Sequence, residues 1–148
     1  SVAAYPETHP DAKSPQEDID TLKKKIDAGA DHIITQFFFD NNKYYDFLER
    51  LAKNNITTPV SPGIFPIINW ERAARFATIC QSHLPDNLHK LFANVTNSDL
   101  QKNLGLFYAA EQCVNLSKNG VDRFHFYTMN HYQLPLAICH ILGIKSTS

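Results

Sequence analysis

The chain has 148 residues, of which 43% are hydrophobic and 20% charged, and its formal net charge is −1. This length is enough for one domain with a real core. There is no excess of basic residues to favour nucleic acid, and no apolar run approaches the roughly 20 residues of a membrane-spanning helix. Three widely spaced cysteines predict no disulfide framework. We therefore expect a cytoplasmic protein without nucleic-acid or membrane partners.

Short apolar runs alternate with helical patterns along the chain. Ser14-Pro15-Gln16-Glu17 is a capping box that opens a helix, and Gly29 closes that helix. Asn69 and Ser98 open two later helices, and Gly120 closes the second of them. In chain order, the predicted elements are a strand over 2–5, a helix over 15–28, a strand over 33–39, a helix from 41 or 42 to 54, a strand over 59–67, a helix over 69–80, a short helix after 85, a helix over 98–118, a strand over 121–129 and a helix over 134–142.

This order of elements predicts an α/β fold with four parallel strands, each followed by a helix. Short joints between a helix and the next strand, as at Gly29 and Gly120, are typical of parallel strands linked by crossover helices. Two architectures fit: a small doubly wound sheet, or part of a (β/α)8 barrel. A complete barrel takes about 250 residues, so four units match half of one. Because the only methionine is Met129 and strand-like sequence begins at Val2, we interpret residues 1–148 as a single-domain fragment.

The strand predicted over 33–39 contains one amide, Gln36, in an otherwise largely apolar run. Alternation along a strand places Gln36 on the same face as Ile34 and Phe38. Burying an amide without a hydrogen bond costs about 1–3 kcal/mol, so Gln36 needs a partner. Two interpretations follow from the pattern alone: a core amide bonded to neighbouring backbone, or a polar anchor for a bound ligand.

Polar residues gather where the predicted strands end, which is where parallel α/β folds bind ligands. They are Tyr5, Glu7, His9, Gln36, Asp40, Asn69, Tyr127, Thr128, Asn130 and His131. The five glycines form no Gly-x-Gly-x-x-Gly and no phosphate-binding loop, which disfavours a Rossmann-type site. No metal site is predicted, because the candidate ligands are placed so that they diverge: His125, His131, Cys139 and His140.

Four blocks of the sequence resemble the methylenetetrahydrofolate reductases in their bacterial form. They are Val2-Ala3-Ala4-Tyr5-Pro6-Glu7-Thr8-His9-Pro10, Ile34-Thr35-Gln36-Phe37-Phe38-Phe39-Asp40, Pro62-Gly63-Ile64-Phe65-Pro66 and Phe124-His125-Phe126-Tyr127-Thr128-Met129-Asn130. The resemblance implies a (β/α)8 barrel that binds FAD and reduces 5,10-methylenetetrahydrofolate to 5-methyltetrahydrofolate with NADH or NADPH, by ping-pong hydride transfer. It also implies that this chain is the C-terminal half of that barrel.

The resemblance further implies which residues contact FAD. They are Tyr5, His9, Ala12, Asp18, Thr21, Lys24 and Lys25. Thr21 stands where we expect asparagine in relatives, and Lys24 where we expect arginine, so the planar fork of an arginine is lost. The residues alone assign the lysine triplet 23–25 to a solvated helix end. However, Asp18, Thr21 and Lys25 are spaced i, i+3 and i+7, which places them on one helix face.

For the substrates, the resemblance implies contacts from Gln36, Arg72, Phe76 and His131, although His131 falls where relatives usually carry arginine. The acidic residues that act on the folate belong to the N-terminal half, so we expect this chain alone to lack reductase activity. Its expected partners are the folate, the N-terminal half-barrel and further copies in a homo-oligomer. Two alternatives stay open: a non-catalytic half-barrel that serves assembly, and a flavodoxin-like nucleotide-binding domain.

Overall fold

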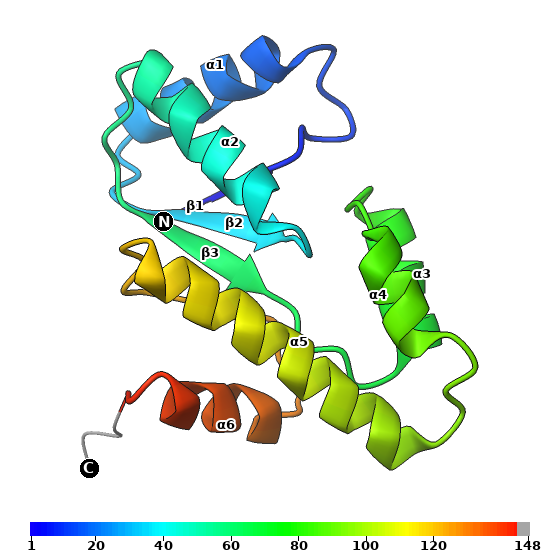
Figure 1. Ribbon diagram of the computed structural model, residues 1–148. Coiled ribbons are helices and arrows are strands. Elements are labelled where there is room, and N and C mark those ends of the chain that lie inside the picture. Colours follow the sequence, from blue (N-terminus) through cyan, green and yellow to red (C-terminus); the bar gives the residue numbers. More distant parts are fainter. Residues whose placement is uncertain (145–148) are drawn as a thin grey trace.

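The computed structural model describes residues 1–144, so the last four residues of the predicted 1–148 unit lie outside it. The described residues form one parallel sheet with the strand order β1-β2-β3-β4 (Figure 1). The strands are β1 (Val2–Ala4), β2 (Ile33–Phe37), β3 (Val60–Ile64) and β4 (His125–Phe126). The helices are α1 (Pro15–Asp27), α2 (Asn41–Lys53), α3 (Trp70–Ile79), α4 (Asp86–Phe92), α5 (Ser98–Lys118) and α6 (Gln133–Ile141).

The strand order decides between the two predicted architectures. A doubly wound sheet reverses its order at a switch point and carries helices on both faces. Here consecutive strands are neighbours throughout, and Ala4 and Ile33 pack against α1 and α2. Ile34 and Gln36, which alternate with buried neighbours in β2, are only half-buried. The fold is therefore four consecutive βα units of a (β/α)8 barrel, and the flavodoxin-like alternative is wrong.

Side-chain caps begin most of the long helices. Ser14 accepts a hydrogen bond from the Glu17 backbone N–H at 3.2 Å, as the capping box predicts. α2 begins at Asn41, within the predicted bounds, and Asp40 caps it, because its carboxylate accepts from the Asn42 backbone N–H at 2.9 Å. α5 begins at Ser98, as predicted, and Asn97 caps it. None of the helices within residues 1–144 is both long and apolar enough to cross a membrane.

All four strands are shorter than the sequence predicts, since β1 ends at Ala4 and β3 spans only Val60–Ile64. The pairing of β2 with β3 shifts register between Ile34 and Phe37, and β2 ends at Phe37. Phe38 lies beyond that end and packs against α5 and α6, so it does not extend the half-exposed face of Gln36. The strand predicted over 121–129 contracts to two paired residues, because only His125 and Phe126 lie in register with β3.

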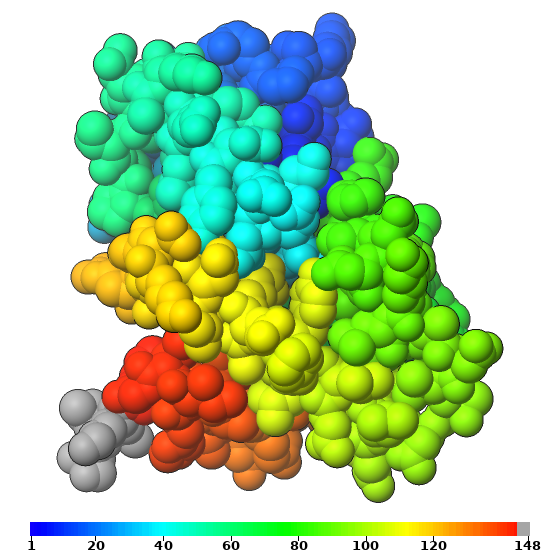
Figure 2. Space-filling view, in the orientation of Figure 1, coloured from blue at the N-terminus to red at the C-terminus, as the bar shows by residue number. Residues whose placement is uncertain are grey.

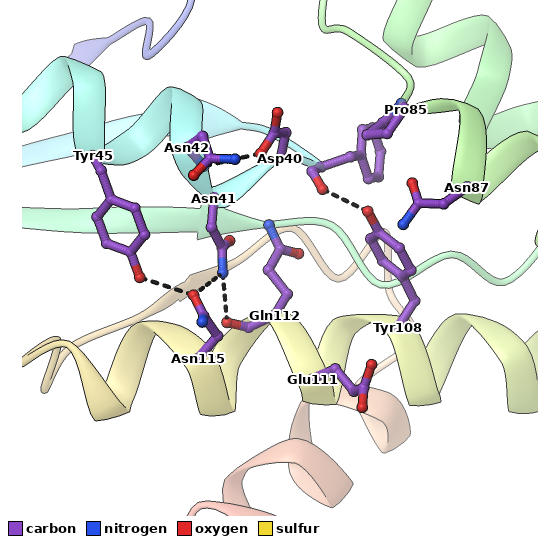
Figure 3. A pocket seen from close by; sticks show the side chains of 11 residues that line it. Asp40, Asn41, Asn42, Tyr45, Pro85, Asn87, Tyr108, Glu111, Gln112 and Asn115 are labelled. Carbon is purple, nitrogen blue, oxygen red and sulfur yellow. Dashed lines mark hydrogen bonds between the residues drawn. The ribbon is translucent and has the colours of Figure 1, made fainter.

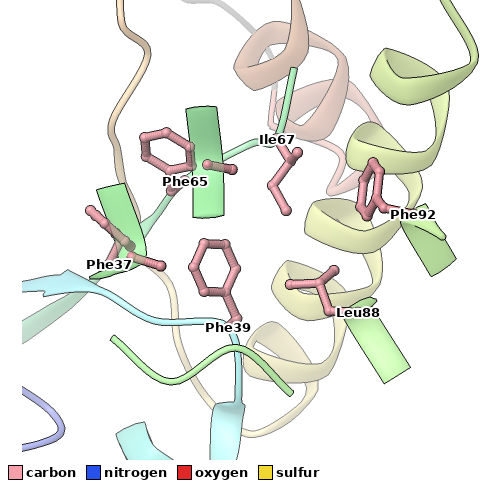
Figure 4. Close-up of a cluster of buried hydrophobic side chains, with 8 residues drawn as sticks. Phe37, Phe39, Phe65, Ile67, Leu88 and Phe92 are labelled. Atoms are coloured by element: carbon pink, nitrogen blue, oxygen red, sulfur yellow. The ribbon is translucent and has the colours of Figure 1, made fainter. Parts of the chain in front are cut away.

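Three hydrophobic clusters join the helices to the sheet. One packs β1 and β2 against α1 and α2, and a second packs β3 against α5 and α6. The third closes the carboxyl end of the sheet with α3 and α4, which lie beyond the arrowheads of β2 and β3 in Figure 1. Figure 4 shows its members Phe37, Phe39, Phe65, Ile67, Leu88 and Phe92. This cluster fixes the strand ends that carry the predicted ligand residues.

Tyr44 on α2 makes stability depend on pH in the alkaline range. Its side chain is 2% exposed, its ring stacks on Phe38 at 5.4 Å, and its hydroxyl donates to the Val60 carbonyl at 3.3 Å. Burial raises the pKa of Tyr44 from 10.0 to about 12, and a charge on Tyr45 adds to this. The unfolded phenol ionises first, so stability is fully present below pH 10 and is lost as the pH rises toward about 12.

We expect the free energy of unfolding to fall by about 2 kcal/mol across this window. Tyr44→Phe should remove that part of the decline, as measured by urea denaturation at a series of pH values. Tyr132→Phe, at a tyrosine that is 66% exposed, is the matched control and should keep it. An unchanged alkaline slope in Tyr44→Phe would assign the decline to another group.

Candidate functional site

The loop after β1 folds back onto α1 and brings predicted FAD residues together. The rings of Tyr5 and His9 meet edge to face, with centroids 4.4 Å apart. Asp18 on α1 accepts a hydrogen bond from the His9 backbone N–H at 3.0 Å. Ala12 closes a turn in the same loop by donating its N–H to the His9 carbonyl at 3.0 Å. The contact between His9 and Asp18 therefore ties the loop to the helix.

Asp18, Thr21 and Lys25 line one shallow pocket against β1, with Ala3 and Ala4 at its base. The single helix face predicted for these three residues is confirmed. The Thr21 hydroxyl donates a hydrogen bond to the Glu17 carbonyl at 2.9 Å, so its one donor group is already bonded within α1. Lys24 does not line this pocket, and neither do Tyr5, His9 and Ala12.

A second pocket, of about 40 Å³, lies where β3 and β4 end. Arg72 and His131, two of the predicted substrate residues, both line it beside Phe65 and Thr128. Phe76 lies next to them, because the Arg72 guanidinium sits 5.8 Å from the centroid of its ring. Phe76 and Phe65 are also in contact range, with ring centroids 6.0 Å apart. Three of the four predicted substrate residues are therefore neighbours.

Gln36, the fourth predicted substrate residue, is half-buried and lies beside an unusually close approach of β2 and β3. A Cβ atom on Gly63 would lie 2.2 Å from the Thr35 carbonyl oxygen and 2.8 Å from the Tyr127 ring. The Gly63 N–H donates to the Thr35 hydroxyl at 2.8 Å. The Tyr127 hydroxyl donates to the Thr35 carbonyl at 3.1 Å. Only glycine fits here, and these contacts fix the backbone next to Gln36.

Sequence reasoning missed Thr35, Gly63 and Tyr127 as supports of the site. Gly63 lies in a proline-rich run that indicates an irregular strand, and Tyr127 was one of many polar residues at strand ends. A glycine inside a predicted strand was the one available signal, since it often marks close backbone approach. Thr35 gave no such signal, because threonine is common in strands.

Two tyrosines at this edge remain neutral hydrogen-bond donors near physiological pH. Burial raises the pKa of Tyr5, and charge on Cys80, Asp18 and Asp11 raises it further. Burial also raises the pKa of Tyr127, with smaller contributions from Tyr5 and Cys80. The edge from β1 to β4 therefore presents phenol O–H groups rather than phenolates.

A larger pocket, of about 490 Å³, lies elsewhere, between α2, α4 and α5 (Figure 3). Most of its polar groups bond to each other or to backbone. Asn41 donates to Asn115 at 2.8 Å, Tyr45 donates to the same Asn115 oxygen at 2.9 Å, and Gln112 donates to the Phe38 carbonyl at 2.8 Å. None of the residues predicted to contact FAD or the substrates lines this pocket, although Asp40, one of the polar residues at the strand ends, does. We therefore assign it to holding the end of β2 rather than to ligand binding.

The histidines and cysteine weighed for metal binding do not form a centre. Across residues 1–144, no group of three or more histidine, cysteine, aspartate or glutamate side chains is arranged to hold a metal ion. The three cysteines, Cys80, Cys113 and Cys139, are free thiols. Burial raises the pKa of Cys113 to about 12, with a smaller contribution from Cys139, so Cys113 is an inert thiol near neutral pH.

Polar side chains at the carboxyl ends of consecutive parallel strands are the arrangement in which (β/α)8 proteins bind ligands. The fold and the pockets beside Arg72 and Asp18 therefore define part of a (β/α)8 barrel with candidate ligand sites. Comparison with known proteins identifies it further. The family model described as methylenetetrahydrofolate reductase matches residues 1–143. The chain belongs to the methylenetetrahydrofolate reductase family.

Individual relatives agree with the family match. The 5,10-methylenetetrahydrofolate reductase of Pectobacterium carotovorum is 44% identical over 146 residues, covering 98% of this chain and 49% of the relative. The enzyme of the same name from Escherichia coli K12 is 42% identical with the same coverage. An Arabidopsis thaliana protein named methylenetetrahydrofolate reductase (NADH) 1 is 34% identical over 158 residues, covering 27% of its length. The chain thus spans about half the length of the bacterial relatives.

A solved structure shares the fold. It is a Clostridium thermocellum protein described as uncharacterized and as binding two copies of 5-methyl-5,6,7,8-tetrahydrofolic acid. The superposition has a TM-score of 0.56 at 17% sequence identity and covers 96% of this chain and 51% of that one. At this identity, the likeness establishes the fold alone.

Proposed function

We propose that this chain is the C-terminal half of a reductase barrel that converts 5,10-methylenetetrahydrofolate to 5-methyltetrahydrofolate. In this proposal FAD is the bound cofactor, NADH or NADPH is the hydride source, and the two substrates use one site in turn by a ping-pong mechanism. The observation that carries the proposal is the family match over residues 1–143. The folate ligand of the Clostridium thermocellum structure agrees with a folate substrate for this fold.

The residues at the end of β1 fit a bound dinucleotide. Lys25 offers a positive charge for a phosphate, and Asp18 offers a carboxylate for a hydroxyl group, on the same side of α1. Ala3 and Ala4 line the strand side of this pocket, which has a volume of about 20 Å³. Bound FAD would supply the hydride-carrying chemistry. We assign its binding to Tyr5, His9, Ala12, Asp18, Thr21 and Lys25, with Lys24 less directly placed because it does not line the pocket of Asp18 and Lys25.

The residues near the ends of β2, β3 and β4 would bind and orient the two substrates. Phe76 offers an aromatic face for stacking, and the Arg72 guanidinium above it offers positive charge. Gln36 can donate to and accept from a planar heterocycle through one amide. His131 lines the same pocket as Arg72 and would contact the more distant part of a substrate. These groups position a ligand, and none of them is assigned a proton-transfer step.

The proposal also includes the partners and the location. The acidic residues that act on the folate would come from an N-terminal half-barrel, which would pair with the open edges of this sheet. We propose a homo-oligomer of the full enzyme, and a cytoplasmic location, which free thiols at Cys80, Cys113 and Cys139 support. The alternative is a non-catalytic half-barrel, and the following experiments distinguish it from the proposed reductase.

Lys25→Ala should raise the dissociation constant for FAD about tenfold, because it removes a charge-assisted hydrogen bond to phosphate. Lys23→Ala removes the same charge from a side chain that does not line the pocket, and should change the affinity less than about twofold. The measurement is a titration of FAD into the natural full-length protein, monitored by flavin absorption at about 450 nm. Equal effects of the two substitutions would contradict the FAD assignment.

A steady-state assay then tests whether turnover requires the N-terminal half of the barrel. Residues 1–148 alone, supplied with FAD, NADH and 5,10-methylenetetrahydrofolate, should give no turnover, and the full-length protein should turn over. Robust turnover by the isolated chain would overturn the placement of the acidic groups in another half. A full-length protein that binds neither flavin nor folate would instead favour the non-catalytic half-barrel.

A further inference from the structure

The outer face of α5 carries a stripe of two apolar and two charged residues. Phe107, Glu111, Val114 and Lys118 follow the spacing i, i+4, i+7 and i+11, which keeps them on one side of the helix. Phe107 is 55% exposed. With Ile141 of α6, also 55% exposed, these residues line a groove of about 450 Å³. Figure 2 shows α5, in yellow, and α6, in red, side by side on the surface.

Completion of the barrel does not cover this groove. α2 flanks α5 on one side, through the bonds of Asn41 and Tyr45 to Asn115, and α6 packs against it on the other. The sheet is open only beyond its outer strands β1 and β4. Further βα units would therefore add beside those strands, and the face of α5 between its two neighbours would stay exposed.

The charges of the stripe are self-complementary. Glu111 and Lys118 are both exposed, and neither forms an ion pair with any residue in the described part of the chain. They lie seven residues apart, or about 10 Å along the helix, with Val114 between them. A twofold axis near Val114 would place Glu111 of each copy opposite Lys118 of the other. A parallel arrangement would instead oppose like charges.

We propose that this stripe is the docking surface for a second copy of the chain, with the two α5 helices packed antiparallel. The interface is isologous, so one patch meets itself. Two ion pairs flank the contact of Val114 with its counterpart, and Phe107 of each copy enters the groove beside Ile141 of the other. The inference rests on the proposed homo-oligomer and not on the proposed chemistry.

The test is the mass of the natural full-length protein by sedimentation velocity, with two opposite charge reversals. Glu111→Lys leaves only positive charge on the stripe and Lys118→Glu leaves only negative charge. Each variant alone should raise the dissociation constant for self-association by about tenfold or more. Mixed together, they should associate to within about threefold of the unchanged protein, since each meets its opposite. Glu49→Lys on α2, which reverses an exposed charge away from the stripe and also breaks the ion pair of Glu49 with Lys53, is the control and should associate normally.

The mixing step separates docking from misfolding, because two misfolded variants do not restore each other. Phe107→Ser should also weaken association, while its circular dichroism stays that of the unchanged protein. Three results would overturn the proposal: an unchanged protein that is monomeric at every concentration, single reversals that associate normally, or a mixture that fails to recover. None of these measurements depends on flavin or turnover, so they stand apart from a failure of the proposed reductase.

Discussion

Gly105→Ala is expected to lower the free energy of unfolding by at least about 3 kcal/mol. Gly105 lies within α5, where a Cβ atom would be 1.7 Å from the carbonyl oxygen of Ile67 and 2.7 Å from its carbonyl carbon. These are backbone atoms that no rotamer change can move. α5 would therefore have to shift away from the segment that follows β3. The gain in helix propensity from alanine is only about 1 kcal/mol and does not offset this.

Gly120→Ala is the control, because Gly120 follows the same helix and no atom lies within 4 Å of its added Cβ. Its φ of +91° makes alanine unfavourable by about 1 kcal/mol for backbone reasons alone. Urea denaturation of both variants measures the difference. If Gly105→Ala costs no more than Gly120→Ala, α5 does not pack on the Ile67 backbone as closely as described.

Gln36→Ala is expected to slow both half-reactions of the full-length protein by about 10–100-fold. The two half-reactions are flavin reduction by NADH or NADPH and flavin reoxidation by 5,10-methylenetetrahydrofolate. In the proposed site, one amide contacts both ligands in turn, so its loss affects both rates. FAD affinity should change less than about twofold, because Gln36 does not line the pocket of Asp18 and Lys25.

Stopped-flow spectroscopy of the flavin band measures each half-reaction separately. Gln16→Ala removes an exposed amide from α1 and should leave both rates unchanged. Loss of flavin with unchanged rates would count against Gln36 as a substrate contact. An effect on one half-reaction alone would show that the two ligands do not share this amide.

The sequence by itself determined the alternation of strands and helices, because local signals specify it. The capping box at Ser14 and the helix-closing glycines mark helix ends through hydrogen bonds to nearby backbone. It also determined that Asp18, Thr21 and Lys25 share a helix face, since helical periodicity is a local property. The family resemblance, confirmed by the match over residues 1–143, came from residues at the strand ends.

The element order alone left a doubly wound sheet and part of a barrel open, and the family resemblance implied the barrel. The tertiary structure confirmed it through the strand order, which is a long-range property. It also decided where the strands stop. β2 ends at Phe37 because side chains from α5, rather than a neighbouring strand, bond the next carbonyls. The close approach at Gly63, which fixes the backbone beside Gln36, depends on Thr35 and Tyr127 from distant parts of the chain. Local patterns contain no information about such contacts, since the partners meet only when the sheet has formed.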